Sequence, residues 1–140
     1  MMTVETSFRH EALLYAGTDD FVASTTGFIR TGIANDEATL VVVSATKIDL
    51  LRENLGLDAQ SVFFADMNAV GLNPARIIPA WRDFVAEYGA GGRRLRGIGE
   101  PIWKGRGPAE LVESQRHEAL LNVAFAGGQP WYLLCPYDTE

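Results

Sequence analysis

Residues 38–43 read Ala38-Thr39-Leu40-Val41-Val42-Val43, an apolar run that is rich in β-branched side chains and lacks polar alternation. Such a run is typical of a strand that is covered on both faces, as in a parallel sheet. On either side of it, helix-like and strand-like segments alternate along the chain. This alternation predicts an α/β domain of three layers, α-β-α, with a mainly parallel five-stranded sheet and right-handed crossovers.

The other elements are predicted from short apolar runs and from apolar residues at helical spacing. The four further strands are expected at Glu11–Ala16, Ser61–Ala65, Leu95–Gly99 and Trp131–Cys135. The helices are expected from about Phe21 to Ile33, from Lys47 to Leu55, from Asn73-Pro74 onward, and from Gly107 to about Ala126. Pro79 lies within the third helix, so we expect a kink or a later start there.

The composition fits one folded domain, with 140 residues of which 47% are hydrophobic. We expect residues 1–6 to form a disordered tail and residues 7–140 to form a single domain. The net charge of -6 argues against a nucleic-acid-binding surface, and no apolar run reaches the ~18 residues of a membrane span. One cysteine excludes an internal disulfide, and no signal peptide is visible, so we expect a cytoplasmic protein.

Polar and aromatic side chains follow the predicted strands. In an open parallel sheet, ligands bind beyond the carboxyl ends of the strands, so we expect these side chains to meet at one edge. Four carboxylates and three aromatic rings there exceed what packing requires, although Asp19 is also a good helix cap. The edge residues are Tyr15, Thr18, Asp19, Ser44, Asp66, Met67, Glu100, Trp103, Tyr137 and Asp138.

Glu100 directly follows an apolar strand. An acid at this position is expected to be partly buried and to need a partner, for which Arg96, Arg116 and His117 are candidates. A ligand contact and a structural pair between the strand and the last helix explain Glu100 equally well.

The known nucleotide-binding and hydrolase patterns do not occur. The turn after the first strand, Ala16-Gly17-Thr18-Asp19-Asp20-Phe21, has one glycine, no lysine and two acids, unlike a phosphate-binding loop. There is also no dinucleotide fingerprint and no Gly-x-Ser-x-Gly elbow. Cys135 with His10 or His117 is the alternative for a nucleophile, and Glu113 with His117 is the alternative for a metal site; a core cysteine and a helical pair explain the same residues. We expect no cofactor.

Six short motifs, taken in order, resemble the MEDS family of sensory domains. They are Phe8-x-His10-x-x-Leu13-Leu14-Tyr15, Phe64-Ala65-Asp66-Met67, Asn73-Pro74-Ala75-Arg76-Ile77-Ile78, Arg96-Gly97-Ile98-Gly99-Glu100-Pro101-x-Trp103, Glu113-x-x-x-His117-Glu118-x-Leu120-x-Asn122 and Leu134-Cys135-Pro136-Tyr137-Asp138. The resemblance therefore covers nearly the whole chain.

The resemblance implies a RecA-like domain whose phosphate-binding loop has degenerated, and a sensory role rather than an enzymatic one. The family is proposed to sense small organic molecules, such as simple hydrocarbon derivatives. In actinobacterial-type proteins it usually precedes a histidine-kinase-like ATPase domain of the anti-sigma regulatory kind. No such domain follows Asp138 here, so we expect either an isolated sensory domain or a stand-alone version.

On this basis we expect a non-catalytic cytosolic domain that binds a small molecule and controls an attached or partner regulator. The alternatives are an interaction module, which includes a homodimer, and a small enzyme that uses Glu100 with His117 or Cys135. The expected ligand-binding residues are Tyr15, Asp66, Glu100, Trp103, Tyr137 and Asp138, with His10 and His117 as secondary candidates.

Overall fold

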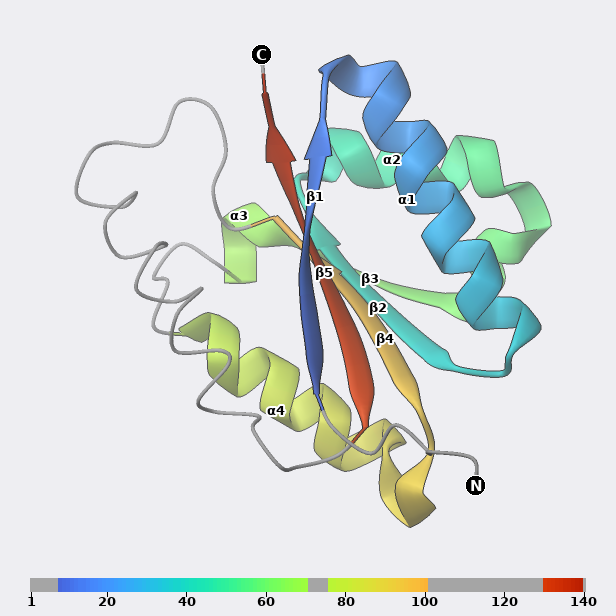
Figure 1. Cartoon of the computed structure of the whole chain (residues 1–140), viewed down its shortest axis with the longest axis vertical. Coiled ribbons are helices and arrows are strands. Elements are labelled where there is room, and N and C mark those ends of the chain that lie inside the picture. Colours follow the sequence, from blue (N-terminus) through green and yellow to red (C-terminus); the bar gives the residue numbers. More distant parts are fainter. Residues whose placement is uncertain (1–7, 71–75, 101–129, 140) are drawn as a thin grey trace, which may run out of the picture.

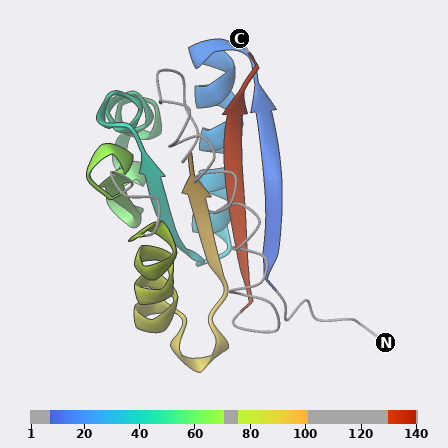
Figure 2. The same cartoon turned by 90° about the vertical axis from the view of Figure 1, so that its left-hand side faces the viewer.

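A five-stranded sheet forms the centre of the computed structural model, which describes residues 8–70, 76–100 and 130–139. All neighbouring strands run parallel, in the order β1-β5-β4-β2-β3. Figure 2 shows strands side by side with their arrowheads toward one end. The predicted α/β class and its five-stranded parallel sheet are therefore confirmed. The strands are β1 (Arg9–Tyr15), β2 (Ala38–Val43), β3 (Val62–Asp66), β4 (Leu95–Gly99) and β5 (Trp131–Asp138).

Helices cover both faces of the sheet, which gives the three predicted layers (Figure 1). On one face lie α1 (Gly17–Ala34) and α2 (Ala45–Leu55), and on the other lie the short α3 (Met67–Val70) and α4 (Ile77–Tyr88). Two 3-10 turns, η1 (Gly56–Ser61) and η3 (Ala90–Gly92), precede β3 and β4. None of the described helices is long and apolar enough to cross a membrane. The predicted helix from Gly107 to Ala126 lies outside the described residues.

Each face of the sheet has its own hydrophobic core. On the α4 face, the rings of Trp81 and Trp131 lie 5.4 Å apart between centroids. Their approach to the sheet requires glycine in β4, because a β-carbon at Gly97 would lie 2.6 Å from the Trp81 ring and one at Gly99 would lie 2.9 Å from it. The Gly97-x-Gly99 pattern therefore admits an indole ring to the surface of the sheet. On the other face, the largest fully buried side chains include Phe21, Ile29 and Leu51.

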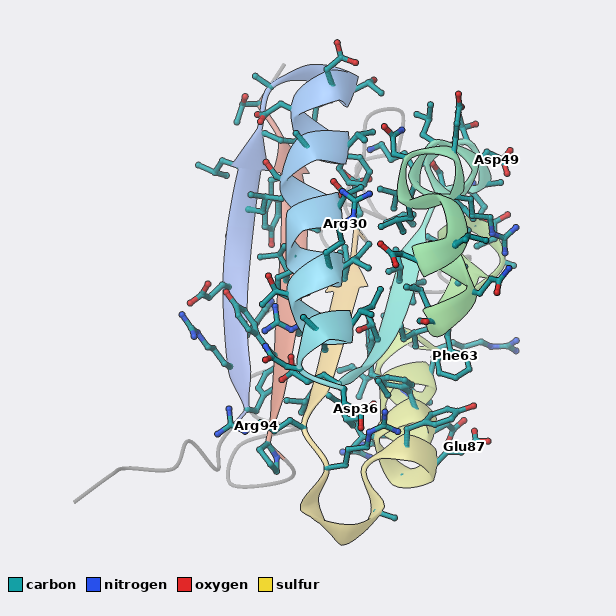
Figure 3. All side chains as sticks on the ribbon, turned by 90° about the vertical axis from the view of Figure 1, so that its right-hand side faces the viewer. Arg30, Asp36, Asp49, Phe63, Glu87 and Arg94 are labelled. Carbon is teal, nitrogen blue, oxygen red and sulfur yellow. The ribbon has the colours of Figure 1, made fainter. Side chains whose placement is uncertain are left out.

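The helices on the face that α1 and α2 cover are joined at their surface. Arg30 of α1 donates a hydrogen bond to the carbonyl oxygen of Asn54 at 2.9 Å and approaches Asp58 of η1 at 3.4 Å. Figure 3 shows Arg30 on the flank of α1 that is turned toward α2. These contacts hold α1, α2 and η1 together as one layer.

Two boundaries differ from prediction near the start of the chain. The first strand begins at Arg9, two residues before Glu11, and α1 begins at Gly17, well before Phe21. The helix can start early because Asp20 accepts a hydrogen bond from the backbone N–H of Ala16 at 2.9 Å, which satisfies a donor of the first turn. The acid that contacts the backbone there is thus Asp20.

Two prolines fit into regular elements without a break. Pro79 lies in the first turn of α4, where a backbone nitrogen makes no intrahelical hydrogen bond. Of the two expected outcomes, a kink or a later start, the structure therefore shows the later start, at Ile77. The predicted beginning at Asn73-Pro74 lies outside the described residues. β5 continues through Pro136, beyond its predicted end at Cys135. Proline is tolerated there because it lies past Leu134, the last β5 residue that is paired with β4.

Candidate functional site

The carboxyl ends of the strands surround a cavity of about 210 Å³. All five strands contribute to its wall, through their last residue or the segment that follows. The strand order reverses between the neighbours β2 and β4, because the chain continues from β2 to β3 on one side and from β4 to β5 on the other. Open α/β sheets bind ligands in the crevice at such a point. The lining residues are Tyr15, Ser44, Lys47, Met67, Asn68, Glu100 and Asp138.

Three polar side chains form one hydrogen-bonded network on this wall. Lys47 Nζ donates to Glu100 Oε1 at 2.5 Å and to Tyr15 Oη at 2.7 Å. Tyr15 Oη in turn donates to Glu100 Oε2 at 2.5 Å. Each carboxylate oxygen therefore accepts a strong hydrogen bond, one of them from a cation. The network joins the ends of β1 and β4 to the first turn of α2.

The burial of the network explains why its members are paired. The Glu100 side chain is 3% exposed and that of Lys47 is 20% exposed. A buried carboxylate is tolerated when a cation and hydrogen bonds compensate its lost hydration, as they do here. The ammonium also lies 4.6 Å from the centre of the Phe21 ring, which adds a cation–π contact.

The phenol of Tyr15 stays protonated at neutral pH. Burial, followed by the hydrogen bond to Glu100 and the charges of Glu100 and Asp138, raises the pKa of Tyr15 well above its usual range. Tyr15 thus donates its proton to a fixed carboxylate and accepts one hydrogen bond from Lys47.

The backbone of α2 places Lys47 at the cavity. Ser44 is the N-cap of this helix, and its Oγ accepts from the backbone N–H of Lys47 at 3.4 Å. A cation in the first turn is repelled by the positive end of the helix dipole, and no acid in that turn offsets this repulsion. Because Glu100 supplies the missing negative charge from β4, the lysine is stable there. Sequence reasoning missed Lys47; a lysine where helices prefer acids was the available signal.

The structure brings together only part of the predicted set. Tyr15, Glu100 and Asp138 line the cavity, as do the strand-end residues Ser44 and Met67. Asp66 instead accepts a hydrogen bond from the backbone N–H of Asn68 at 2.9 Å. The partners of Glu100 are Lys47 and Tyr15, whereas Arg96 binds Glu37 at 2.8 Å. Tyr137 packs against the core of the α4 face, and Trp103, Arg116 and His117 lie outside the described residues.

His10 lies toward the amino end of β1, away from the cavity. Its Nε2 is 3.1 Å from Cys135 Sγ, and this cysteine is 1% exposed. A cysteine nucleophile would need a histidine beside it, and His10 lies beside Cys135. This contact belongs to the core of the α4 face, however. Among residues 8–70, 76–100 and 130–139, no three His, Cys, Asp or Glu side chains gather closely enough to hold a metal ion. The other candidate ligands, Glu113 and His117, fall outside these ranges.

Fold and site together define a three-layer α/β domain with a cavity at the carboxyl edge of a parallel sheet, and polar side chains lie on the cavity wall. A comparison with protein-family models identifies which such domain it is. Residues 9–140 match the model of MEDS, the methanogen/methylotroph, DcmR sensory domain. Since the match covers nearly the whole chain, the chain belongs to the MEDS family of sensory domains. A search of curated proteins gives no match.

Proposed function

We propose that this domain senses a small organic molecule that binds in the cavity at the carboxyl edge of the sheet. The observation that carries the proposal is the cavity wall, which holds the buried network of Tyr15, Lys47 and Glu100. Membership of a sensory family supports a role in detection. The ligand is small, because about 210 Å³ lies below the range of about 300–1,000 Å³ that is usual for ligand pockets.

The network offers a route from ligand to output. It connects β1, β4 and α2, so a ligand that contacts Lys47 or Tyr15 acts on three elements together. A ligand biases two conformations only through its different affinity for each of them. We propose that the output is a changed interface with an attached or partner module of the anti-sigma or histidine-kinase-like type, and that the domain acts in the cytoplasm without catalysis.

An interaction module without a ligand is the rival function. An edge filled by packed aromatic side chains would favour it. The described side chains instead leave a cavity with polar groups on its wall, which favours ligand binding.

Native mass spectrometry of the purified chain tests the proposal, through a comparison of its native and denatured masses. Glu100→Gln alters the cavity wall, and Glu37→Gln is the matched control because it changes a largely buried, arginine-paired acid elsewhere. We expect a small non-covalent adduct, from the purified protein or from a metabolite extract, that Glu100→Gln loses and Glu37→Gln keeps. An adduct that both variants retain, or no adduct from any extract, contradicts the proposal.

A further inference from the structure

The ammonium of Lys47 has one donor more than its partners use. A lysine ammonium carries three N–H groups, and Glu100 and Tyr15 accept two of them. The Phe21 ring lies against the ammonium but has no oxygen to accept the third. Among the residues that the structure describes, no further acceptor contacts this nitrogen. Lys47 lines the cavity, so a ligand atom is the natural acceptor for its remaining N–H.

The hydroxyl of Ser44 supplies a second donor on the same wall. Its oxygen accepts from the backbone N–H of Lys47, and no acceptor for its own proton is found in the described part of the chain. Ser44 and Lys47 both line the cavity from the start of α2. A carbonyl oxygen has two lone-pair positions, so one such atom can accept from both residues.

The charges around the cavity select against ionic ligands. Glu100 neutralises Lys47, the one cation among the lining residues that the structure describes. An anion would therefore leave water for a wall whose ion pair carries no net charge. A cation would lie against the Lys47 ammonium and would leave both donors of α2 without an acceptor. An uncharged ligand avoids both penalties.

We infer that the cavity binds a small uncharged carbonyl compound, such as an amide, a ketone or an aldehyde, with its oxygen held by Lys47 Nζ and Ser44 Oγ. Met67 provides an apolar wall for the carbon part of the ligand. This inference rests on the proposed function, and it names the class of ligand for the same site.

Three probes of nearly equal shape separate the effect of charge from that of size: acetamide is neutral, acetate is an anion and acetamidinium is a cation. The reporter is the methyl signal of Met67 in protein labelled with carbon-13 at methionine methyl groups. The chain has only three methionines, and the other two, Met1 and Met2, serve as internal controls. We expect acetamide to shift the Met67 signal saturably in the millimolar range, at least about ten-fold more tightly than either ion.

Variants assign the effect to the two donors. Ser44→Ala removes one donor, and the pair Lys47→Met/Glu100→Gln removes the other without leaving an unpaired buried charge. Each is expected to weaken acetamide binding at least about ten-fold, while an unchanged far-UV circular dichroism spectrum shows that the fold is kept. The matched pair Arg96→Met/Glu37→Gln changes an ion pair outside this cavity and is expected to keep the affinity for acetamide.

Several results would overturn the inference. Acetate or acetamidinium binding as tightly as acetamide would do so, and so would unchanged acetamide affinity in both cavity variants. No Met67 shift with acetamide up to about 100 mM would also overturn it. A mass adduct that Glu100→Gln removes, seen together with such silence toward acetamide, would refute the ligand class alone and leave the proposed function standing.

Discussion

The two ends of the sheet each hold an acid, a cation and a tyrosine, but they use them differently. At the carboxyl end, Lys47 and Glu100 meet beside Tyr15 on the wall of a cavity of about 210 Å³. Toward the amino end, Arg96 donates to Glu37 at 2.8 Å, and the Tyr132 ring lies 5.2 Å from its guanidinium.

The environment of Arg96 is the more enclosed of the two. Its guanidinium also donates to the carbonyl oxygen of Phe28 at 3.3 Å and lies 4.5 Å from the ring of that residue. Gly32 of α1 lies directly over its stem, since a β-carbon there would be 2.7 Å from Arg96 Cδ. Arg96 and Glu37 line a cavity of about 110 Å³, about half the volume of that at the carboxyl end. The Arg96–Glu37 pair thus packs against Gly32, Phe28 and Tyr132 beside a cavity of about 110 Å³, whereas the Lys47–Glu100 pair borders one of about 210 Å³, which makes the carboxyl end the better candidate for a binding site.

The largest expected effect is at the amino end. Arg96→Ala leaves the largely buried carboxylate of Glu37 without its cation and removes the contacts with Phe28, so we expect the free energy of unfolding to fall by about 3 kcal/mol. Urea denaturation measures this. The control Arg82→Ala, at an exposed position of α4, is expected to change stability by less than about 0.5 kcal/mol. If Arg96→Ala lowers the free energy of unfolding no more than Arg82→Ala does, the Arg96–Glu37 pair is not a structural tie and the comparison fails.

Glu100→Gln is expected to cost less, about 1–2 kcal/mol, because Lys47 borders the cavity and can turn its ammonium toward water. Adding Lys47→Met should restore part of the loss, since no unpaired charge then remains. The same denaturation experiment, run beside Arg96→Ala, checks the order. If Glu100→Gln proves the more damaging change, the carboxyl-end network is chiefly a structural tie and the comparison fails.

A smaller effect is expected from the ionisation of Tyr15. Since the pKa of Tyr15 is raised far above its ordinary value of about 10, its contribution to stability is present below about pH 10 and is lost only as pH rises through the higher folded value. At about pH 11, native wild type and Tyr15→Phe should therefore show equal tyrosinate absorbance at 295 nm. In urea, wild type should show one more ionised tyrosine. A difference between the two native proteins would mean that Glu100 and burial do not protect the phenol.

The smallest effect is expected at the exposed rim of the amino end. Tyr132 donates to Glu11, and this hydrogen bond, followed by that from Arg9, lowers the pKa of Glu11. A lowered carboxyl pKa stabilises the fold above the unfolded value of about 4.3 and ceases to do so as pH falls through the folded value. Glu11→Gln should cost less than about 1 kcal/mol near pH 7, and less at pH 3 than at pH 7. Thermal melts at both pH values measure the difference, and an equal cost at both would show that the charge of Glu11 plays no part.

Much of the fold follows from the sequence because its signals are local. The unbroken run Ala38–Val43 and the helical stripe of Ile77, Trp81 and Phe84 each identify their own element. The ends were harder to place, because they depend on contacts from elsewhere. Asp20 extends α1 backward by binding the Ala16 N–H, and β5 runs through Pro136 since its partner there is β1 alone.

The lining of the cavity was predicted in part for the same reason. Tyr15, Glu100 and Asp138 could be expected at one edge because each of them ends or directly follows a parallel strand. Lys47 could not, since only the crossover from β2 brings α2 next to the end of β4, 53 positions further along the chain. The partner expected for Glu100 was an arginine or a histidine, because no local pattern links it to α2.

The most direct test of the central claim, that the carboxyl-edge cavity is the sensory site, uses the lysine side chains. The chain has two lysines, Lys47 and Lys104, so nitrogen-15 labelling of lysine gives two ammonium signals, which a Lys47→Arg variant assigns. We expect the Lys47 signal to be that of a hydrogen-bonded ammonium and to shift when the compound found by native mass spectrometry is added. A Lys47 signal that does not move while that compound is bound would contradict the account.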